Sequence, residues 1–127
     1  MRVLVVDDDP SVRETLGELL KAFGHQVSTA SDYAEAAAML DRPAWDVMLI
    51  DQMLPGGSGH TLALAARNRG VGAVLCSGHP HQIAELQRQG IAHLVKPFSG
   101  SALDAALAAV APRGMTGGSA PGTFPEP

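Results

Sequence analysis

The sequence is poor in cysteine, in aromatic residues and in basic clusters. A single cysteine, Cys76, excludes an internal disulfide and a cysteine-based zinc site. Only one Trp, one Tyr and three Phe occur among 127 residues, and the nine Lys and Arg residues are scattered along the chain. Because few rings are available to stack on bases and no basic patch can neutralise phosphates, we expect no direct binding of nucleic acid.

Long hydrophobic runs are also missing. No stretch approaches the roughly 20 consecutive apolar residues that cross a bilayer, so we expect no membrane segment. Charged residues at Arg2 and Asp7 flank the first apolar run and leave no room for the apolar core of a signal peptide. We therefore expect the protein to be cytoplasmic.

The composition that is present is that of a globular domain. Hydrophobic residues make up 46% of the chain and charged residues 17%, with a net charge of −4. The length fits one domain, but the composition turns to Gly and Pro near the C-terminus. We predict one domain over residues 1–111, followed by a Gly/Pro-rich flexible tail over residues 112–127.

Short apolar runs alternate with amphipathic patterns along this domain. Strands are predicted at 3–6, 25–30, 46–51, 71–76 and 91–95. Helices are predicted at 10–23, 33–40, 61–69, 80–89 and 99–111, with a loop at 53–59. Five strand–helix units with continuously apolar strands predict an α/β fold, a doubly wound five-stranded parallel sheet covered on both faces.

Polar residues follow four of the predicted strands. Asp7 and Asp8 follow the first, Asp51 ends the third, and Ser77 and Lys96 follow the fourth and fifth. In an open parallel sheet, ligands bind outside the carboxyl ends of the strands. Clustered carboxylates suit Mg²⁺, and a carboxylate can act as a nucleophile toward phosphorus. A metal ion, a lysine and a hydroxyl could then stabilise different phosphoryl oxygens.

Asp9 allows two interpretations, a third acid of the site or a helix N-cap. We favour the cap, because Pro10 follows at the first helical position. Three like charges in a row are costly without a nearby cation or phosphoryl group.

In four motifs the sequence resembles the receiver domain of two-component response regulators, and the resemblance covers residues 1 to about 111. The motifs are Val5-Val6-Asp7-Asp8-Asp9-Pro10, Asp51-Gln52-Met53-Leu54-Pro55-Gly56, Ser77-Gly78 and Lys96-Pro97-Phe98. The resemblance implies a flavodoxin-like (βα)5 fold and a phosphorylatable signalling switch in a phosphorelay.

The resemblance also implies roles for individual residues. Asp51 would accept a phosphoryl group from a phosphohistidine of a sensor histidine kinase or histidine phosphotransferase. Mg²⁺ would be bound directly by Asp8, Asp51 and the Met53 backbone carbonyl. Asp7 would act through water, Ser77 and Lys96 would bind phosphoryl oxygens, and the Lys96–Pro97 peptide bond would be cis. Such a domain phosphorylates and dephosphorylates itself but turns over no metabolite, so we expect it not to be an enzyme.

Three residues occupy positions where this family tunes its response. His93 stands where Tyr or Phe is usual, so it is either a switch residue or an edge-strand histidine with no switching role. Met53 and His79 stand where the family controls access of water to the aspartyl phosphate. We predict that changing Met53 or His79 alters phosphoryl lifetime more than stability.

The expected output is a change in a protein-binding face. By resemblance, this face comprises the fourth helix, the fifth strand and the last helix, whose alanines also permit a homodimer. The downstream protein target is unknown. The chain fits either a single-domain regulator or a receiver detached from a hybrid kinase or a longer regulator.

The main alternative is a phosphohydrolase of the haloacid-dehalogenase type, with Asp7 of Asp7-x-Asp9 as the nucleophile. That family needs an acidic pair after its lysine, whereas only Asp104 and Glu126 follow Lys96. An FMN carrier is less favoured, because three successive acids would repel the flavin phosphate.

Overall fold

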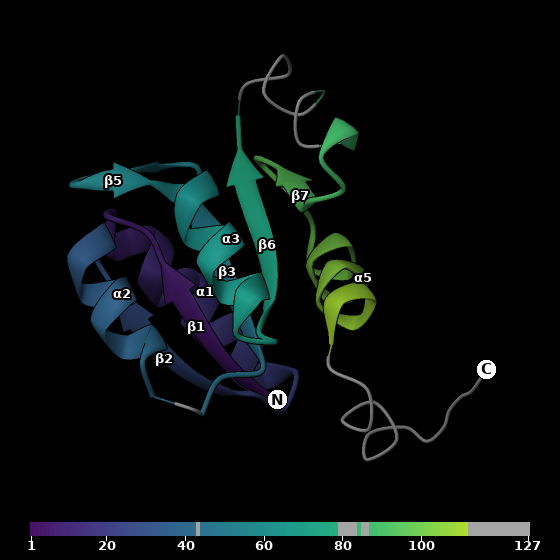
Figure 1. Ribbon diagram of the computed structural model, residues 1–127. Helices are drawn as coiled ribbons and strands as arrows, with labels where there is room; N and C mark the ends of the chain where they lie inside the picture. The colour runs from purple at the N-terminus through teal and green to yellow at the C-terminus, as the bar shows by residue number, and fades with distance from the viewer. Residues whose placement is uncertain (43, 79–83, 85–86, 112–127) are drawn as a thin grey trace.

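A computed structural model describes residues 1–42, 44–78, 84 and 87–111, and a five-stranded parallel sheet forms its centre (Figure 1). The strands are β1 (Arg2–Val6), β2 (Gln26–Ala30), β3 (Val47–Asp51), β6 (Gly72–Ser77) and β7 (Ala92–Val95). The helices are α1 (Pro10–Ala22), α2 (Tyr33–Leu40), α3 (Gly59–Asn68) and α5 (Gly100–Val110). The strand order β2-β1-β3-β6-β7 is that of a flavodoxin-like fold, which confirms the predicted class.

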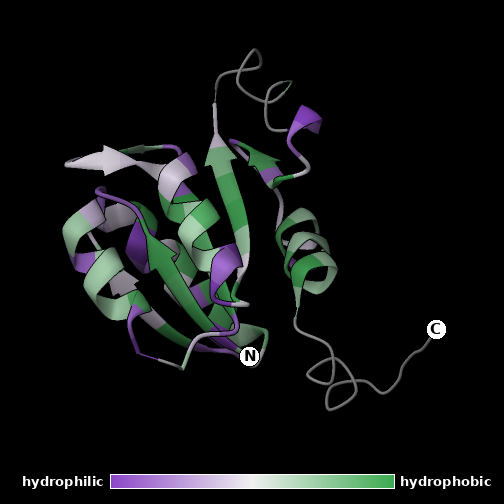
Figure 2. Ribbon diagram, viewed as in Figure 1, coloured by the Kyte–Doolittle hydropathy of each residue, from purple (hydrophilic) through white to green (hydrophobic). Residues whose placement is uncertain are grey.

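Two apolar layers bury the sheet. Leu4, Met48 and Leu75 pack with α2 and α3 on one face. On the other face, Val3 and Leu49 pack with α1 and α5. Figure 2 shows β1 and β6 as hydrophobic along most of their length. Burial on both faces explains why the strands read as continuous apolar runs rather than as alternating patterns.

The predicted helix starts are confirmed at two places. The Asp9 carboxylate accepts a hydrogen bond of 2.9 Å from Ser11 N, and Pro10 begins α1, so Asp9 is the cap. At α2, Asp32 Oδ1 accepts from Glu35 N at 2.8 Å, and the Glu35 carboxylate accepts from Ser31 N at 2.8 Å. The bonds to Ser11 N and Glu35 N satisfy amide groups that the first helical turn leaves without intrahelical partners, and the bond from Ser31 N ties the residue before the cap to α2.

The prediction of a loop over residues 53–59 was wrong. A small antiparallel pair, β4 (Met53–Leu54) and β5 (Gly57–Ser58), occupies most of it and forms the β4–β5 hairpin. Pro55 and Gly56 form its turn, and Gly56 has a φ of +85°, as the third position of a type II turn requires. Helix α3 starts at Gly59, two residues before the predicted start, because Ser58 acts as its N-cap.

The remaining predicted elements agree with the structure to within one or two residues at their ends. For the predicted helix at 80–89, the described residues 84, 87 and 88 are helical, and most of the others lie outside the described residues. The predicted tail at 112–127 also lies outside them. Among the helices of the described part of the chain, none is long and apolar enough to cross a membrane.

Candidate functional site

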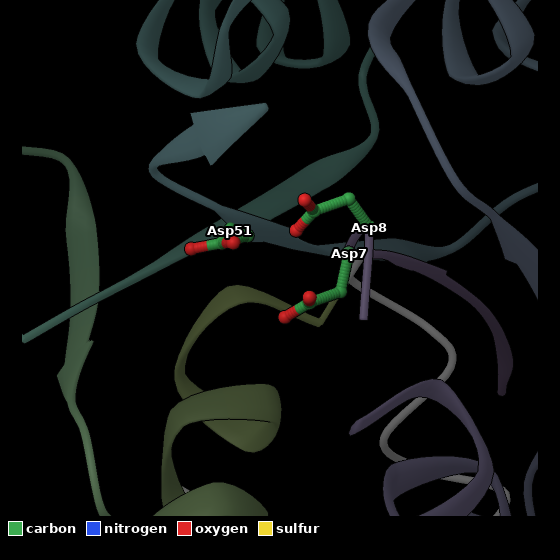
Figure 3. Close-up of side chains that lie close together, drawn as sticks. All are labelled: Asp7, Asp8 and Asp51. Carbon is green, nitrogen blue, oxygen red and sulfur yellow. The ribbon is translucent and has the colours of Figure 1, made fainter. Parts of the chain in front are cut away.

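Three carboxylates meet at the carboxyl edge of the sheet (Figure 3). Asp7 and Asp8 directly follow β1, and Asp51 is the last residue of the neighbouring strand β3. One carboxylate oxygen from each lies within 4.8 Å of the others. Asp7 is buried with 4% of its surface exposed, whereas Asp8 is exposed. The predicted acid cluster is therefore present and open to solvent on the Asp8 side.

Strand pleating brings a lysine to the same place. Leu49 and Leu94 belong to the apolar layer under α1 and α5. Because alternate residues of a strand share a face, Asp51 and Lys96, each two positions further on, lie on that face too. Lys96 Nζ lies 3.3 Å from Asp51 Oδ1 and 3.3 Å from Asp7 Oδ2. The ammonium group thus bridges the two least exposed carboxylates.

The charges in this cluster influence one another. Burial has the largest effect and raises the pKa of the Asp51 carboxyl; Asp7 adds to the rise, while Lys96 and the Met53 backbone N–H oppose it. Burial lowers the pKa of Lys96, but the attraction of Asp51 and Asp7 outweighs it and leaves this pKa above its ordinary value. The lysine therefore stays protonated.

The donor set fits a divalent cation such as Mg²⁺. Three carboxylates face a single ammonium group, so acidic groups outnumber basic ones in this cluster. All the ligand atoms offered are hard oxygens, which Mg²⁺ prefers. A cation bound among Asp7, Asp8 and Asp51 would lower the repulsion that these carboxylates exert on one another.

Hydrogen bonds hold the acidic turn after β1. The Asp7 carboxylate accepts from Asp9 N at 3.0 Å, and Arg13 Nη1 donates to the Asp7 carbonyl oxygen at 2.8 Å. No sequence pattern indicated the role of Arg13, because one basic residue in a helix is usually a solvated surface group. Its partner is a carbonyl oxygen, which no residue pattern reveals.

The β4–β5 hairpin forms the other wall of the site. A hollow of about 470 Å³ lies between Asp8 and this hairpin, with Met53 on its rim. Met53 has 64% of its surface exposed. At the end of the hairpin, Gly59 passes so close to β3 that an added Cβ would lie 2.3 Å from the Asp51 carbonyl oxygen. Only glycine fits this approach of backbone to backbone.

The other predicted residues are placed as follows. Ser77 is buried at the end of β6, next to Cys76, which pairs in register with Asp51. Lys96 N donates to the Ser77 carbonyl oxygen at 2.9 Å, and the Lys96–Pro97 bond is cis, as predicted. The structure thus brings Asp7, Asp8, Asp51 and Lys96 into one cluster and sets Ser77 on the adjacent strand.

His93 is half-buried on β7, an edge strand of the sheet. Ala92 and Leu94 pack under α1 and α5, so His93 lies on the opposite face, the one that α2 and α3 cover. His79 lies outside the described residues, so the prediction for it remains a prediction.

A parallel sheet of this order with an acid cluster and a lysine at its carboxyl edge defines a class of signalling domain, and the comparisons with known proteins agree. Residues 3–108 match the family described as the response regulator receiver domain. The chain belongs to this family, whose members are signalling switches rather than classical enzymes. This membership favours the receiver interpretation over the phosphohydrolase alternative.

Several curated relatives are transcriptional or response regulators. The chain is 34% identical to the phosphate regulon transcriptional regulatory protein PhoB of Klebsiella pneumoniae, in a match covering 86% of this chain and 51% of PhoB. It is 39% identical to the response regulator protein FleR of Pseudomonas aeruginosa over 80% of this chain and 23% of FleR. The chain thus spans about half the length of the PhoB sequences it matches, or less for FleR.

Solved structures of response regulators share this fold. The chemotaxis response regulator CheY4 of Vibrio cholerae matches with a TM-score of 0.75 and 29% identity, over 86% of this chain and 97% of that one. The response regulator TrrA of Thermotoga maritima, solved in complex with Mg²⁺ and BeF, matches with a TM-score of 0.76 and 28% identity, over 86% and 97% of the two chains.

Proposed function

We propose that this protein is a phosphorylatable switch of a two-component phosphorelay and that Asp51 is its phosphoacceptor. The observation that carries the proposal is the position of the Asp51 carboxylate, which lies at the carboxyl edge of the sheet between two further carboxylates and the Lys96 ammonium group. A nucleophile with a cation held beside it is what phosphoryl transfer requires.

The proposed reaction transfers a phosphoryl group from a phosphohistidine of a sensor histidine kinase or histidine phosphotransferase. A carboxylate oxygen of Asp51 attacks the phosphorus atom; an O–P bond forms, the P–N bond breaks, and its electron pair remains on the imidazole of the donor. Lys96 and Ser77 bind the phosphoryl oxygens. Asp8, Asp51 and the Met53 carbonyl would hold Mg²⁺ directly, and Asp7 would act through water. When bound, Mg²⁺ supplies positive charge that draws the anionic phosphoryl group to an acidic site.

A groove beside Lys96 supports a protein donor. It has a volume of about 560 Å³ and is mainly apolar, and it is lined by Ser11, Val12, Thr15, Leu16, Lys96, Pro97 and Phe98. A helix of the histidine-bearing partner could pack its apolar side there and bring its phosphohistidine to the edge of the sheet. We place the donor on this groove for that reason.

We place the output on β7 and α5. Val95 is exposed at the end of the edge strand β7, and several alanines of α5 face solvent. A change around Ser77 and His93 would reach this face directly, because Ser77 ends β6 and His93 lies on β7 itself. A downstream protein, or a second copy of the chain as a homodimer, would bind it. Residues 1–111 would act as this unit, alone or within a longer regulator.

The test is intact mass spectrometry after incubation with acetyl phosphate and Mg²⁺. We expect one phosphoryl adduct, lost in Asp51→Asn and lost when Mg²⁺ is chelated. Binding of beryllofluoride in the presence of Mg²⁺ covers the case in which the adduct hydrolyses too fast to see. An adduct on Asp7 would support the hydrolase alternative instead, and failure of both phosphorylation and beryllofluoride binding would refute the proposed function.

A further inference from the structure

The ring of Tyr33, the first residue of α2, lies against the β4–β5 hairpin. A Cβ added to Gly57 would lie 2.5 Å from Cδ2 and 2.6 Å from Cγ of this ring. Atoms do not pack that closely, so no larger residue fits at position 57 while the ring stays in place. The backbone at Gly57 is outside the left-handed region. The ring alone therefore demands glycine there.

A second contact joins the same two elements. Tyr33 N donates a hydrogen bond of 3.1 Å to the carbonyl oxygen of Pro55, in the turn of the hairpin. Tyr33 is partly buried against the apolar layer under α2 and α3, and Asp32 caps the helix that carries it. One residue thus holds the turn by its backbone and the strand β5 by its ring.

This hairpin carries one wall of the acceptor site. It begins at Met53, two residues after Asp51, and it ends at Gly59, whose backbone lies against the Asp51 carbonyl. Its residues line the hollow that Asp8 borders. A two-residue strand pair has little stability of its own, so an outside contact must fix its position.

We propose that Tyr33 is a positioning residue of the acceptor site. By holding Gly57 and Pro55 of the β4–β5 hairpin, it fixes the position of the Met53 backbone carbonyl. This inference rests on the proposed function in one respect, the use of the Met53 carbonyl as a Mg²⁺ ligand. Residues that orient the ligands of a metal ion without touching the ion change metal affinity when they are replaced. Tyr33 would therefore affect Mg²⁺ binding without touching the ion.

The test compares Mg²⁺ dissociation constants, measured by isothermal titration calorimetry, among ring variants. We expect Tyr33→Ala to weaken Mg²⁺ binding by about three- to tenfold, below the range usual for partners of dedicated metal sites. Tyr33→Phe keeps the ring and the backbone bond and should bind Mg²⁺ like the wild type. If Tyr33→Ala does not fold, Tyr33→Leu takes its place. Leucine keeps an apolar side chain in this layer but has no flat ring to cover Gly57.

Gly57→Ala tests the fit from the other side. We expect it to weaken Mg²⁺ binding when the ring is present and to add little in the Tyr33→Ala background, because the atom it clashes with is then gone. Such non-additivity is the mark of residues in direct contact. Val110→Ala, a partly buried residue of α5 in the other apolar layer, serves as a control that lowers stability without approaching the hairpin.

Thermal unfolding without Mg²⁺ is measured for every variant beside the dissociation constant. A purely structural role would lower the unfolding temperature of Tyr33→Ala and leave its Mg²⁺ affinity equal to that of the wild type and of Val110→Ala; that result would overturn the inference alone. A wild-type protein that neither binds Mg²⁺ nor takes a phosphoryl group would overturn the proposed function together with it.

Discussion

Lys96 Nζ lies 3.3 Å from Asp51 Oδ1, although 45 residues separate the two in the chain. The side chain of Lys96 reaches across the end of β6, which lies between the strands that carry the two residues. The same nitrogen lies 3.3 Å from Asp7 Oδ2. One cation thus lies beside both the buried Asp7 and the partly exposed Asp51, and under the proposed function it would bind an incoming phosphoryl group.

Replacing Lys96 should separate metal binding from phosphoryl transfer. In Lys96→Met we expect phosphorylation by acetyl phosphate to slow by about a hundredfold or more, because a donor to the transferred group is lost. Mg²⁺ affinity should stay equal or rise, because the ammonium group no longer repels the metal ion. Lys21→Met, at an exposed position in the last turn of α1, is the matched control. If Lys96→Met lost Mg²⁺ affinity as strongly as phosphorylation rate, the proposed separation of metal binding from phosphoryl transfer would be wrong.

The raised pKa of Asp51 predicts how stability depends on pH. A carboxyl whose pKa is higher in the folded state favours folding while protonated and loses that contribution as pH rises through the raised value. Asp51→Asn removes the cost of placing a charge in this partly buried position. Without Mg²⁺ it should therefore unfold about 2–6 °C above the wild type near pH 7.

The difference in unfolding temperature between the wild type and Asp51→Asn should disappear below the ordinary carboxyl pKa of about 3.9, where the side chain at position 51 is neutral in both proteins. Added Mg²⁺ should raise the unfolding temperature of the wild type more than that of Asp51→Asn. Thermal melts by circular dichroism at several pH values measure both effects. A gap that widens as the pH is lowered would show that the charged form of Asp51 is the favoured one.

The acid and lysine cluster was predictable from the sequence because each of its members ends or follows a buried strand. Asp7, Asp51 and Lys96 needed only the rule that parallel strands bring their carboxyl ends to one edge. The same rule placed Ser77 beside them. The short apolar runs predicted where the strands end, and the parallel sheet then brought these distant residues together.

The parts that support this cluster were not predictable. The contact of Tyr33 with Gly57 depends on the orientation of one ring across 24 positions of sequence, and the partner of Arg13 is a backbone oxygen. Strands of two residues, as in the β4–β5 hairpin, are too short to show alternation. Sequence patterns report which side chains are buried, but not which atoms a particular side chain touches.

Gly59 should tolerate no side chain. In Gly59→Ala the new Cβ would lie 2.3 Å from the Asp51 carbonyl oxygen and 3.0 Å from Gln52 Cα, and backbone atoms cannot give way as a flexible side chain can. We expect a loss of about 1–3 kcal/mol in the free energy of unfolding, measured in urea.

Gly17→Ala provides the opposite case in the same protein. Its new Cβ would meet Val27 Cγ1 at 3.9 Å, an ordinary contact, within the middle of α1. Alanine is the better helix former, so this variant should gain about 0.5–1 kcal/mol. Similar losses in both variants would mean that close packing at Gly59 is not the cause.

Arg13 should act on the acidic turn through the Asp7 carbonyl. In Arg13→Met the hydrogen bond of 2.8 Å is lost and the turn that carries Asp7 and Asp8 loosens. We expect Mg²⁺ binding, followed by calorimetry, to weaken several-fold, with a loss of stability of about 1 kcal/mol. Arg69→Met is the control, since Arg69 also donates to a carbonyl oxygen, that of Leu40, and pairs with Asp41 away from the site. The hypothesis does not survive if the two variants bind Mg²⁺ alike.

Cys76 reports on the same edge of the sheet without any mutation. It is 3% exposed and pairs in register with Asp51, and burial raises the pKa of its thiol to about 12. Only the thiolate reacts with iodoacetamide, so at pH 8 we expect alkylation of the folded protein to be about a thousandfold slower than in urea. The part of the reaction that proceeds through opened molecules should slow further with Mg²⁺, because an ion that binds only the folded state lowers their population. If Mg²⁺ slows the alkylation of Cys76, the sheet edge and the metal site open as one unit. If Cys76 reacts at the unfolded rate, or at a rate that Mg²⁺ leaves unchanged, β6 opens independently of the acid cluster.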